Sequence, residues 1–175
     1  NPCAACSIRE MSICAVLDNS KLSRMAAIAR TQSLSPRQTI IDEGESAESL
    51  FNITGGAVKL YKLLPDGRRQ ITGFLFQGDF LGIALNQEYA YSAEAVSDVT
   101  LCRFPRVRFE ALLDEFPKLE KQLLEVASNE LAQAQDQMLL LGRKTAREKV
   151  VSFLLSVSER ARQRGDAPSP ISLPM

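Results

Sequence analysis

Turn residues recur at a nearly constant interval through the middle of the chain. Gly44, Gly55, Gly67 and Gly78 are spaced 11, 12 and 11 residues apart, and short apolar-rich runs fill the intervals. Short strands separated by turns at this spacing are typical of an antiparallel sandwich or barrel. We therefore expect a β domain in this part of the chain, with strands at 39–42, 48–54, 58–63, 70–74, 91–96 and 99–104.

One hairpin can be identified within this series. Residues 58–63 and 70–74 flank the segment 65–68, which reads Pro-Asp-Gly-Arg. Proline sets φ at the entry of the turn, and Asp-Gly tolerates the positive φ that a tight reversal requires. The two flanking runs are therefore predicted to pair as antiparallel neighbours.

Segments on either side of this β domain have helical periodicity. Apolar positions three or four residues apart predict short helices over 22–31 and 106–115, and another amphipathic helix over about 145–164. A central run of strands between helical segments is typical of the α+β class.

A much longer helix is predicted after the second of these. It begins at Pro117, which suits a first helical turn, and continues without glycine or proline to Leu141, before Gly142 ends it. Apolar residues follow alternating steps of three and four, the heptad spacing of a coiled-coil interface. This seam consists of Leu124, Ala127, Leu131, Ala134, Met138 and Leu141. We expect it to form a homodimer interface, and packing on the chain's own β domain is the alternative.

Three of the four cysteines lie close together near the N-terminus. Cys3, Cys6 and Cys14 have the spacing C-x2-C-x7-C, and Cys102 follows much later on an expected strand. Four thiolates with a C-x-x-C pair can bind a zinc ion or a four-iron cluster, because each metal vertex takes one soft anionic sulfur. Small buried side chains without a metal are the alternative that the spacing leaves open. Disulfides are not expected, because no secretory signal is recognised.

Composition excludes several classes of function. The sequence contains no histidine, which excludes imidazole zinc sites and His-paired thiol catalysis. It also lacks a phosphate-binding glycine loop before a helix and a convincing carboxylate pair, so no enzyme activity is predicted. The formal net charge is zero, which gives the chain no basic footprint for nucleic acid. No apolar run reaches the roughly 20 residues that span a bilayer, so a cytoplasmic location without membrane contact is expected.

Three short stretches of sequence are informative beside the cysteines. They read QITGF at 70–74, GDFLG at 78–82 and QMLLL at 137–141. Together with the cysteine arm and Cys102, they resemble the FNR branch of the CRP/FNR family of transcription regulators. The resemblance covers essentially the whole chain. Members of that family contain a cyclic-nucleotide-binding-type β-roll of the jelly-roll kind, a long dimerisation helix and a helix-turn-helix DNA-binding domain.

The resemblance implies an α+β fold with four parts. Residues 1–19 are the cysteine-rich cluster-binding arm, 20–116 the β-roll sensor domain and 117–142 the dimerisation helix. Residues 143–175 contain a helix and a hinge toward a helix-turn-helix domain that is absent from this sequence. The chain is thus expected to be the sensor and dimerisation portion of a transcription activator whose promoter DNA contacts lie outside it.

The same resemblance implies a cofactor. The FNR branch binds a [4Fe-4S] cluster on three N-terminal cysteines and one cysteine of the β-roll, and oxygen converts or destroys that cluster. Cys3, Cys6, Cys14 and Cys102 take these places here, with zinc as the alternative metal. A cluster-free regulatory β-roll that binds a small effector is the further alternative. The x7 gap is longer than the x5 gap of the best-known FNR pattern and resembles FNR-like regulators of α-proteobacteria. Loss of the cluster is expected to release the arm, weaken the dimer and so weaken DNA binding.

Family members also contact RNA polymerase through exposed loops of the β-roll. The matching segments here are 66–69 and 72–77, and an ordinary solvated hairpin is the alternative interpretation. The candidate contact residues are Asp66, Gly67, Arg68, Thr72 and Gly73.

Cyclic-nucleotide binding is not expected. Pockets of the CRP branch resemble a Gly-Glu-Leu segment for the ribose, followed by an Arg-Ser pair for the cyclic phosphate. This chain has Gly-Asp-Phe at 78–80 and then Tyr91-Ser92. Loss of the arginine removes a charged hydrogen bond worth about 1.5–3 kcal/mol.

Overall fold

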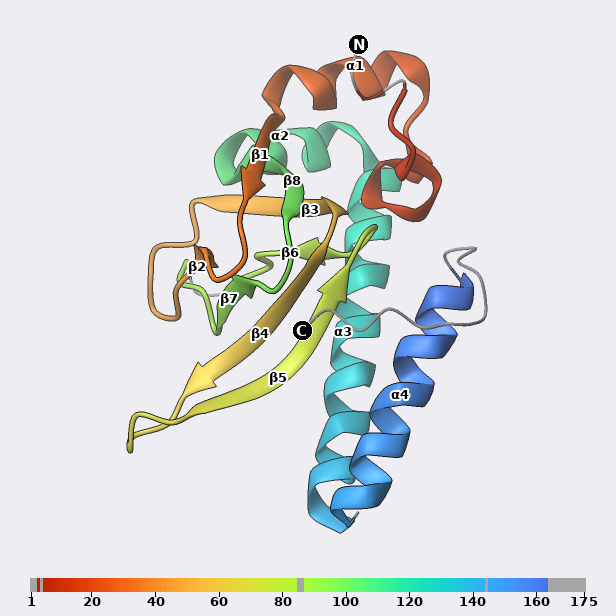
Figure 1. Cartoon of the computed structure of the whole chain (residues 1–175). Coiled ribbons are helices and arrows are strands. Elements are labelled where there is room, and N and C mark those ends of the chain that lie inside the picture. Colours follow the sequence, from red (N-terminus) through yellow and green to blue (C-terminus); the bar gives the residue numbers. More distant parts are fainter. Residues whose placement is uncertain (1–2, 4, 85–86, 144, 164–175) are drawn as a thin grey trace. The chain divides into compact units, whose positions relative to one another are not determined.

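The computed structural model describes residues 3, 5–84, 87–143 and 145–163 (Figure 1), without the side chains of 136, 137, 139–143 and 163. The chain divides into two compact units, Asn1–Ala127 and Ser128–Met175. The first unit contains the strands and the helices that cover them. The second contains the later part of the long helix α3 and the helix α4.

Two antiparallel sheets form the β domain, as the glycine spacing predicted. The first sheet has the strand order β1-β8-β3-β6, with bounds Arg30–Leu34, Val99–Pro105, Ser49–Gly55 and Phe80–Leu81. The second sheet has the order β2-β7-β4-β5, with bounds Thr39–Ile41, Ser92–Ala95, Ala57–Leu63 and Arg69–Phe76. Together with the long helix α3, Pro117–Arg143, this roll confirms the predicted α+β fold.

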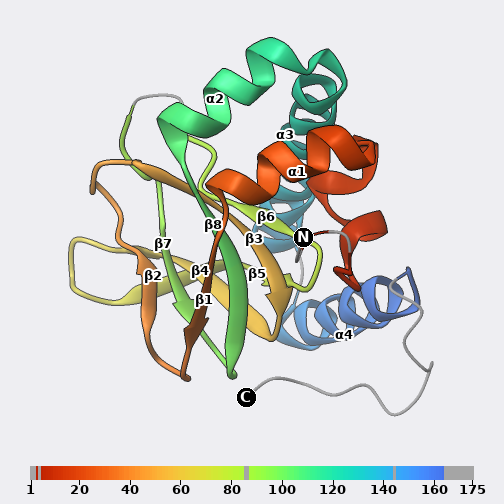
Figure 2. The same ribbon diagram turned by 90° about the horizontal axis from the view of Figure 1, so that it is seen from above.

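The two faces of the first sheet are buried in different cores. One face meets the second sheet, where Leu101 and Val58 are fully buried. The other face packs against helices, where the rings of Phe104 and Phe109 lie 5.5 Å apart. Figure 2 shows these helices side by side over the roll. They are α1, Asn19–Ile28, and α2, Arg106–Glu115.

The predicted hairpin is present between β4 and β5. The two strands pair along their length, and the backbone N–H of Leu64 donates to the carbonyl of Arg68 at 2.8 Å. Gly67 has a φ of +81°, a conformation that residues with a side chain rarely adopt. The turn chemistry read from the sequence therefore matches the backbone.

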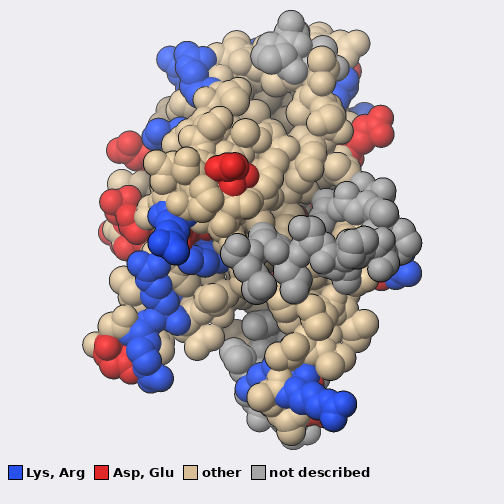
Figure 3. Space-filling view, viewed as in Figure 1, with Lys and Arg blue, Asp and Glu red and all other residues tan. Residues whose placement is uncertain are grey.

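A buried carboxylate ties this hairpin to β7. Lysine and arginine side chains gather along the hairpin in Figure 3. Lys59 Nζ and Arg69 Nη1 lie 2.6 and 2.7 Å from the two carboxylate oxygens of Glu94. Burial by itself raises the pKa of Glu94, but the hydrogen bonds and charges of the two cations outweigh it and the pKa is lowered. The charged carboxylate thus links three strands.

The first helix begins and ends three residues earlier than predicted, and a strand follows where its last residues were expected. The side chain of Asp18 caps α1, which spans Asn19–Ile28 rather than 22–31. Thr31, predicted to be helical, lies on β1 directly opposite Cys102 of β8. The apolar spacing indicated helix here because the pairing with a strand so distant in sequence has no local signal. The two-residue strand β6 was not predicted either.

Helix boundaries near the C-terminus also differ slightly from prediction. Helix α3 continues to Arg143, past Gly142, because a single glycine costs a helix about 1 kcal/mol without ending it. Helix α4 spans Ala146–Gln163 and begins with a capping box. In it, Thr145 Oγ1 accepts from the backbone N–H of Glu148, whose carboxylate accepts from the Thr145 N–H at 2.7 Å. None of the described helices is long and apolar enough to cross a membrane.

Candidate metal centre

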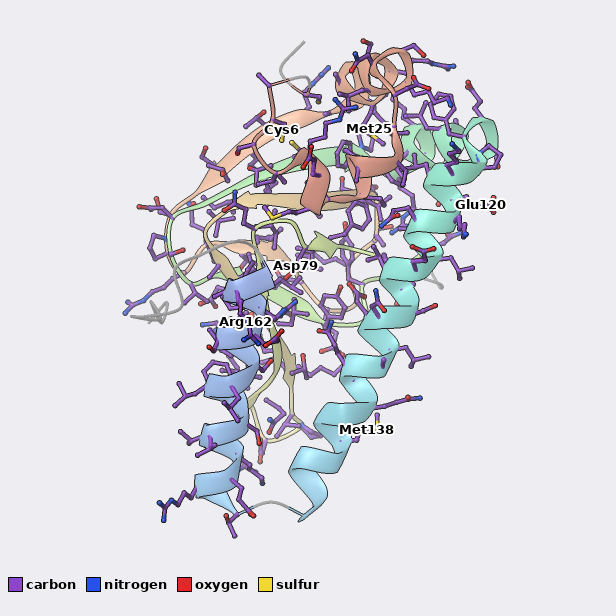
Figure 4. The ribbon with its side chains drawn as sticks, turned by 90° about the vertical axis from the view of Figure 1, so that its right-hand side faces the viewer. Cys6, Met25, Asp79, Glu120, Met138 and Arg162 are labelled. Carbon is purple, nitrogen blue, oxygen red and sulfur yellow. The ribbon has the colours of Figure 1, made fainter. Side chains whose placement is uncertain are left out.

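The four cysteines line one small cavity, although they come from separate parts of the chain. Cys3 and Cys6 lie in the N-terminal arm, Cys14 lies in a short 3-10 helix, and Cys102 lies on β8. Figure 4 shows Cys6 where the arm lies against the β-roll. The cavity has a volume of about 20 Å³ and is lined by Cys3, Cys6, Arg9, Ser12, Cys14, Leu22, Asn52, Cys102 and Phe104. The structure therefore brings together all four predicted ligands.

Apolar anchors hold the arm against the roll. Ile13 and Leu17, at most 2% exposed, pack into the core beneath α1 and α2. The backbone N–H of Leu17 donates to the carbonyl of Cys14 at 3.1 Å and closes the second of two 3-10 turns. Cys14 is thus fixed by burial of its neighbours in the sequence.

Arg9 and Ser12 organise the segment between the second and third cysteines. Arg9 Nη2 donates to the carbonyl of Leu17 at 2.7 Å. Ser12 Oγ donates to the carbonyl of Arg9 at 3.0 Å and accepts from the backbone N–H of Cys14 at 3.2 Å. The seven-residue gap therefore accommodates a local hydrogen-bond network that orients Cys14.

Cys102 stands between two polar residues on neighbouring strands. Thr31 of β1 and Asn52 of β3 lie directly opposite it. Asn52 Oδ1 is buried and has no hydrogen-bond partner in the part of the chain that the structure describes. An unsatisfied buried carbonyl oxygen costs about 1–3 kcal/mol, so this acceptor calls for a donor such as a water molecule or a cysteine S–H. Asn52 was not predicted, and its only signal was a weak β-former within the apolar run 50–53.

The environment of the thiols favours their protonated form. Burial raises the pKa of Cys14 to about 12 and that of Cys102 to about 11, and it also raises the pKa of Cys3. Charge repulsion among neighbouring cysteines adds to the shift, while the hydrogen bond from Ser12 opposes it at Cys14. These thiols are protonated at neutral pH, so a bound metal must displace their protons.

The four thiols are a donor set that fits either zinc or an iron–sulfur cluster. Among the described residues, no three Cys, Asp or Glu side chains already surround a single metal-ion position. Both a zinc ion and a four-iron cluster take four thiolate ligands.

The region expected to lack a cyclic-nucleotide site has contacts of its own. Ser92 Oγ accepts from the backbone N–H of Glu43 at 3.0 Å, and Tyr91 packs against the core between the sheets. The Asp79 carboxylate accepts from the backbone N–H of Phe76 at 2.8 Å. These side chains hold strands and turns together, and the absence of nucleotide binding stays a prediction.

The predicted dimer seam is largely exposed on α3. Leu124, Leu131 and Met138 are 67%, 61% and 70% exposed, and Figure 4 shows Met138 projecting from the helix. Leu124 belongs to the first unit and is not covered by the β-roll, which argues against the alternative of packing on it. Ala127 is half-buried, Ala134 is exposed, and the side chain of Leu141 lies outside the described residues.

The candidate polymerase contacts all lie on the β4–β5 hairpin. The tip contains Asp66, Gly67 and Arg68, where the carboxylate and guanidinium pair at 2.8 Å. Thr72 is exposed on β5, and Gly73 lies opposite a residue of β4. Their contact with polymerase stays a prediction.

Comparison with known proteins assigns the chain to a family. The sequence-family model of the cyclic nucleotide-binding domain matches residues 31–116 of this chain. The nitrogen fixation regulation protein FixK from Bradyrhizobium diazoefficiens is 41% identical over 173 residues, which cover 99% of this chain and 73% of that protein. The chain belongs to the CRP/FNR family of transcription regulators. Relatives in the CRP/FNR family are regulators, in agreement with the prediction that the chain is not an enzyme.

Other relatives support the FNR-like branch of the CRP/FNR family. The transcriptional activatory protein AadR of Rhodopseudomonas palustris is 39% identical over 170 residues, 97% of this chain and 71% of that protein. The fumarate and nitrate reduction regulatory protein of Vibrio cholerae is 31% identical over 176 residues, 99% of this chain and 70% of that protein. The solved structure of FixK2 from Bradyrhizobium japonicum has a TM-score of 0.72 and 38% identity, and the match covers 76% of this chain and 67% of that one.

Proposed function

We propose that this chain is the sensor and dimerisation portion of an oxygen-responsive transcription activator. In this proposal, Cys3, Cys6, Cys14 and Cys102 hold a [4Fe-4S] cluster. One observation carries it: three thiols of the N-terminal arm and one thiol of the distant strand β8 line a single cavity. When bound, such a cluster supplies an oxygen-sensitive redox centre whose properties depend on surrounding hydrogen bonds and burial.

The chain's own packing supports a coupling between the cysteines and the dimer helix. Cys14 and Cys102 pack against the same apolar cluster as Leu119, Leu123 and Val126, which belong to the first turns of α3. Loss of the cluster would release the arm and so change the packing at the base of that helix. The exposed seam farther along α3 then joins two copies less well.

The proposed partners follow from the family. Two copies joined along α3 hold two helix-turn-helix domains at the spacing of promoter half-sites. The β4–β5 hairpin is the proposed contact with RNA polymerase. Zinc is the second candidate occupant, because four thiolates suit it equally well in chemical terms.

Oxygen is expected to weaken the dimer. Analytical ultracentrifugation compares the anaerobic, cluster-loaded chain with the same sample after exposure to air. We expect the dimer dissociation constant to rise at least about tenfold after exposure, a typical size for coupling between two sites. A Cys14→Ser chain, which lacks one ligand, serves as the control. Its dimer dissociation constant is expected to be the same before and after exposure to air. Equal dimer affinity of the parent chain in both conditions would contradict the coupling.

A further inference from the structure

Two arginines stand directly opposite each other on neighbouring strands of the first sheet. Arg30 of the edge strand β1 pairs in register with Arg103 of β8. Opposed residues of antiparallel strands project from the same face of the sheet, and like charges in this relation destabilise it. Some compensation for the two charges is therefore expected nearby.

Carboxylates do not provide that compensation in the part of the chain that the structure describes. The ion pairs found there involve neither Arg30 nor Arg103. Arg30 donates to the neighbouring carbonyl of Ala29 at 3.2 Å. Arg103 Nε donates to Ser49 Oγ at 2.8 Å. Most of the N–H groups on the two guanidinium forks are thus left for another acceptor.

The Arg103 guanidinium is held in a fixed place. Its partner Ser49 is only 3% exposed. The Tyr89 hydroxyl donates to the Ser49 carbonyl at 2.8 Å and accepts from the Ser49 backbone N–H at 3.2 Å. A guanidinium held by a buried network loses little freedom when it binds a ligand.

Both arginines line an open groove of about 410 Å³. Its other lining residues are Thr31, Gln32, Glu48, Ser49 and Pro105. Hydroxyl and amide groups add further donors, and the exposed carboxylate of Glu48 is an acceptor for a hydroxyl group of the ligand. A guanidinium fork binds the two oxygens of a phosphate or carboxylate in parallel.

We propose that this groove binds a small doubly charged oxyanion between Arg30 and Arg103. Phosphate monoesters and dicarboxylates share the required chemistry. The two arginines project from the face of the first sheet opposite to Cys102, because adjacent residues of a strand point to opposite faces. The proposed oxyanion site therefore does not depend on a metal at the cysteines. Strand β8 would carry a ligand-binding residue on each face, Arg103 on one and Cys102 on the other.

Thermal unfolding of the whole chain tests this site with inorganic phosphate and malonate as probes. Each is titrated in the low millimolar range against sodium chloride of equal ionic strength, which removes general screening. We expect either probe to raise Tm by several degrees, with saturation. The larger of the two shifts identifies phosphate or carboxylate as the preferred source of the oxyanion.

Three variants distinguish this site from general salt effects. Arg30→Gln and Arg103→Gln are each expected to weaken the apparent affinity about tenfold, the loss of one charged hydrogen bond. Arg108→Gln, an exposed cation on α2, is expected to bind as the parent does. Without probe, Arg30→Gln is expected to melt at or above the parent Tm, since the opposed charges are gone. The proposal would be overturned if the probes raised the parent Tm no more than sodium chloride does. It would also be overturned if the probes shifted Tm equally in the parent and in both groove variants.

Discussion

A Cys102→Ser chain purified without oxygen is expected to be colourless and to contain only background iron. Cys102 is the one proposed ligand that the β-roll contributes, while the other three lie in the arm. A serine oxygen is too hard a ligand to replace thiolate on iron. The thiol is half-buried, so its loss is expected to change the unfolding free energy of the metal-free roll by only about 1 kcal/mol. Visible absorption, iron analysis and thermal unfolding measure these quantities.

Thr100→Ser is the matched control for this substitution. Thr100 lies on the same strand, two residues from Cys102 and on the same face. Its serine variant keeps a hydroxyl for Thr54, which pairs with Thr100 at 2.9 Å. This control is expected to keep the colour and iron of the parent chain. Parent-like iron in the Cys102→Ser chain would remove Cys102 from the proposed site.

A Leu131→Glu chain is expected to be monomeric under conditions in which the parent is dimeric. Leu131 lies at the middle of the seam and is 61% exposed in the single chain. Burying a leucine contributes about 1.5–3 kcal/mol, and a two-fold interface contains two copies. Two carboxylates at the same place also repel each other. The dimer dissociation constant should therefore rise at least about 100-fold, as measured by sedimentation of the anaerobic, cluster-loaded protein.

Gln133→Glu adds the same charge outside the seam. Gln133 is exposed, and its position two residues from Leu131 places it on a different face of α3. Its dimer affinity is expected to stay within about threefold of the parent, because an exposed charge contributes little. If both variants dimerise like the parent, the apolar seam of α3 is not the interface.

The features predicted well from sequence are those with a local physical cause. Glycine spacing and the Pro-Asp-Gly-Arg turn predicted the two-sheet roll and its hairpin, because positive φ at a tight turn requires particular residues. Absence of helix breakers between Pro117 and Leu141 predicted α3. The cysteine spacing indicated a shared site, and the structure places all four cysteines around one cavity.

Features missed from sequence depend on which strands become neighbours. Strand β1 was taken for the end of a helix, because its pairing with β8 joins residues far apart in the chain. The same pairing brings Arg30 beside Arg103 and Thr31 beside Cys102. Asn52 enters the cavity only because β3 lies on the other side of β8. No local sequence pattern predicts these contacts, so the polar residues around the cysteines could be identified only from the structure.

The most direct test of the cluster proposal is anaerobic purification of the chain, followed by visible absorption and iron, sulfide and zinc analysis. The account predicts a coloured protein with about four iron and four sulfide per chain, and loss of the colour on exposure to air. A colourless protein with about one zinc per chain, and neither iron nor sulfide, would contradict it and support the zinc-stabilised alternative.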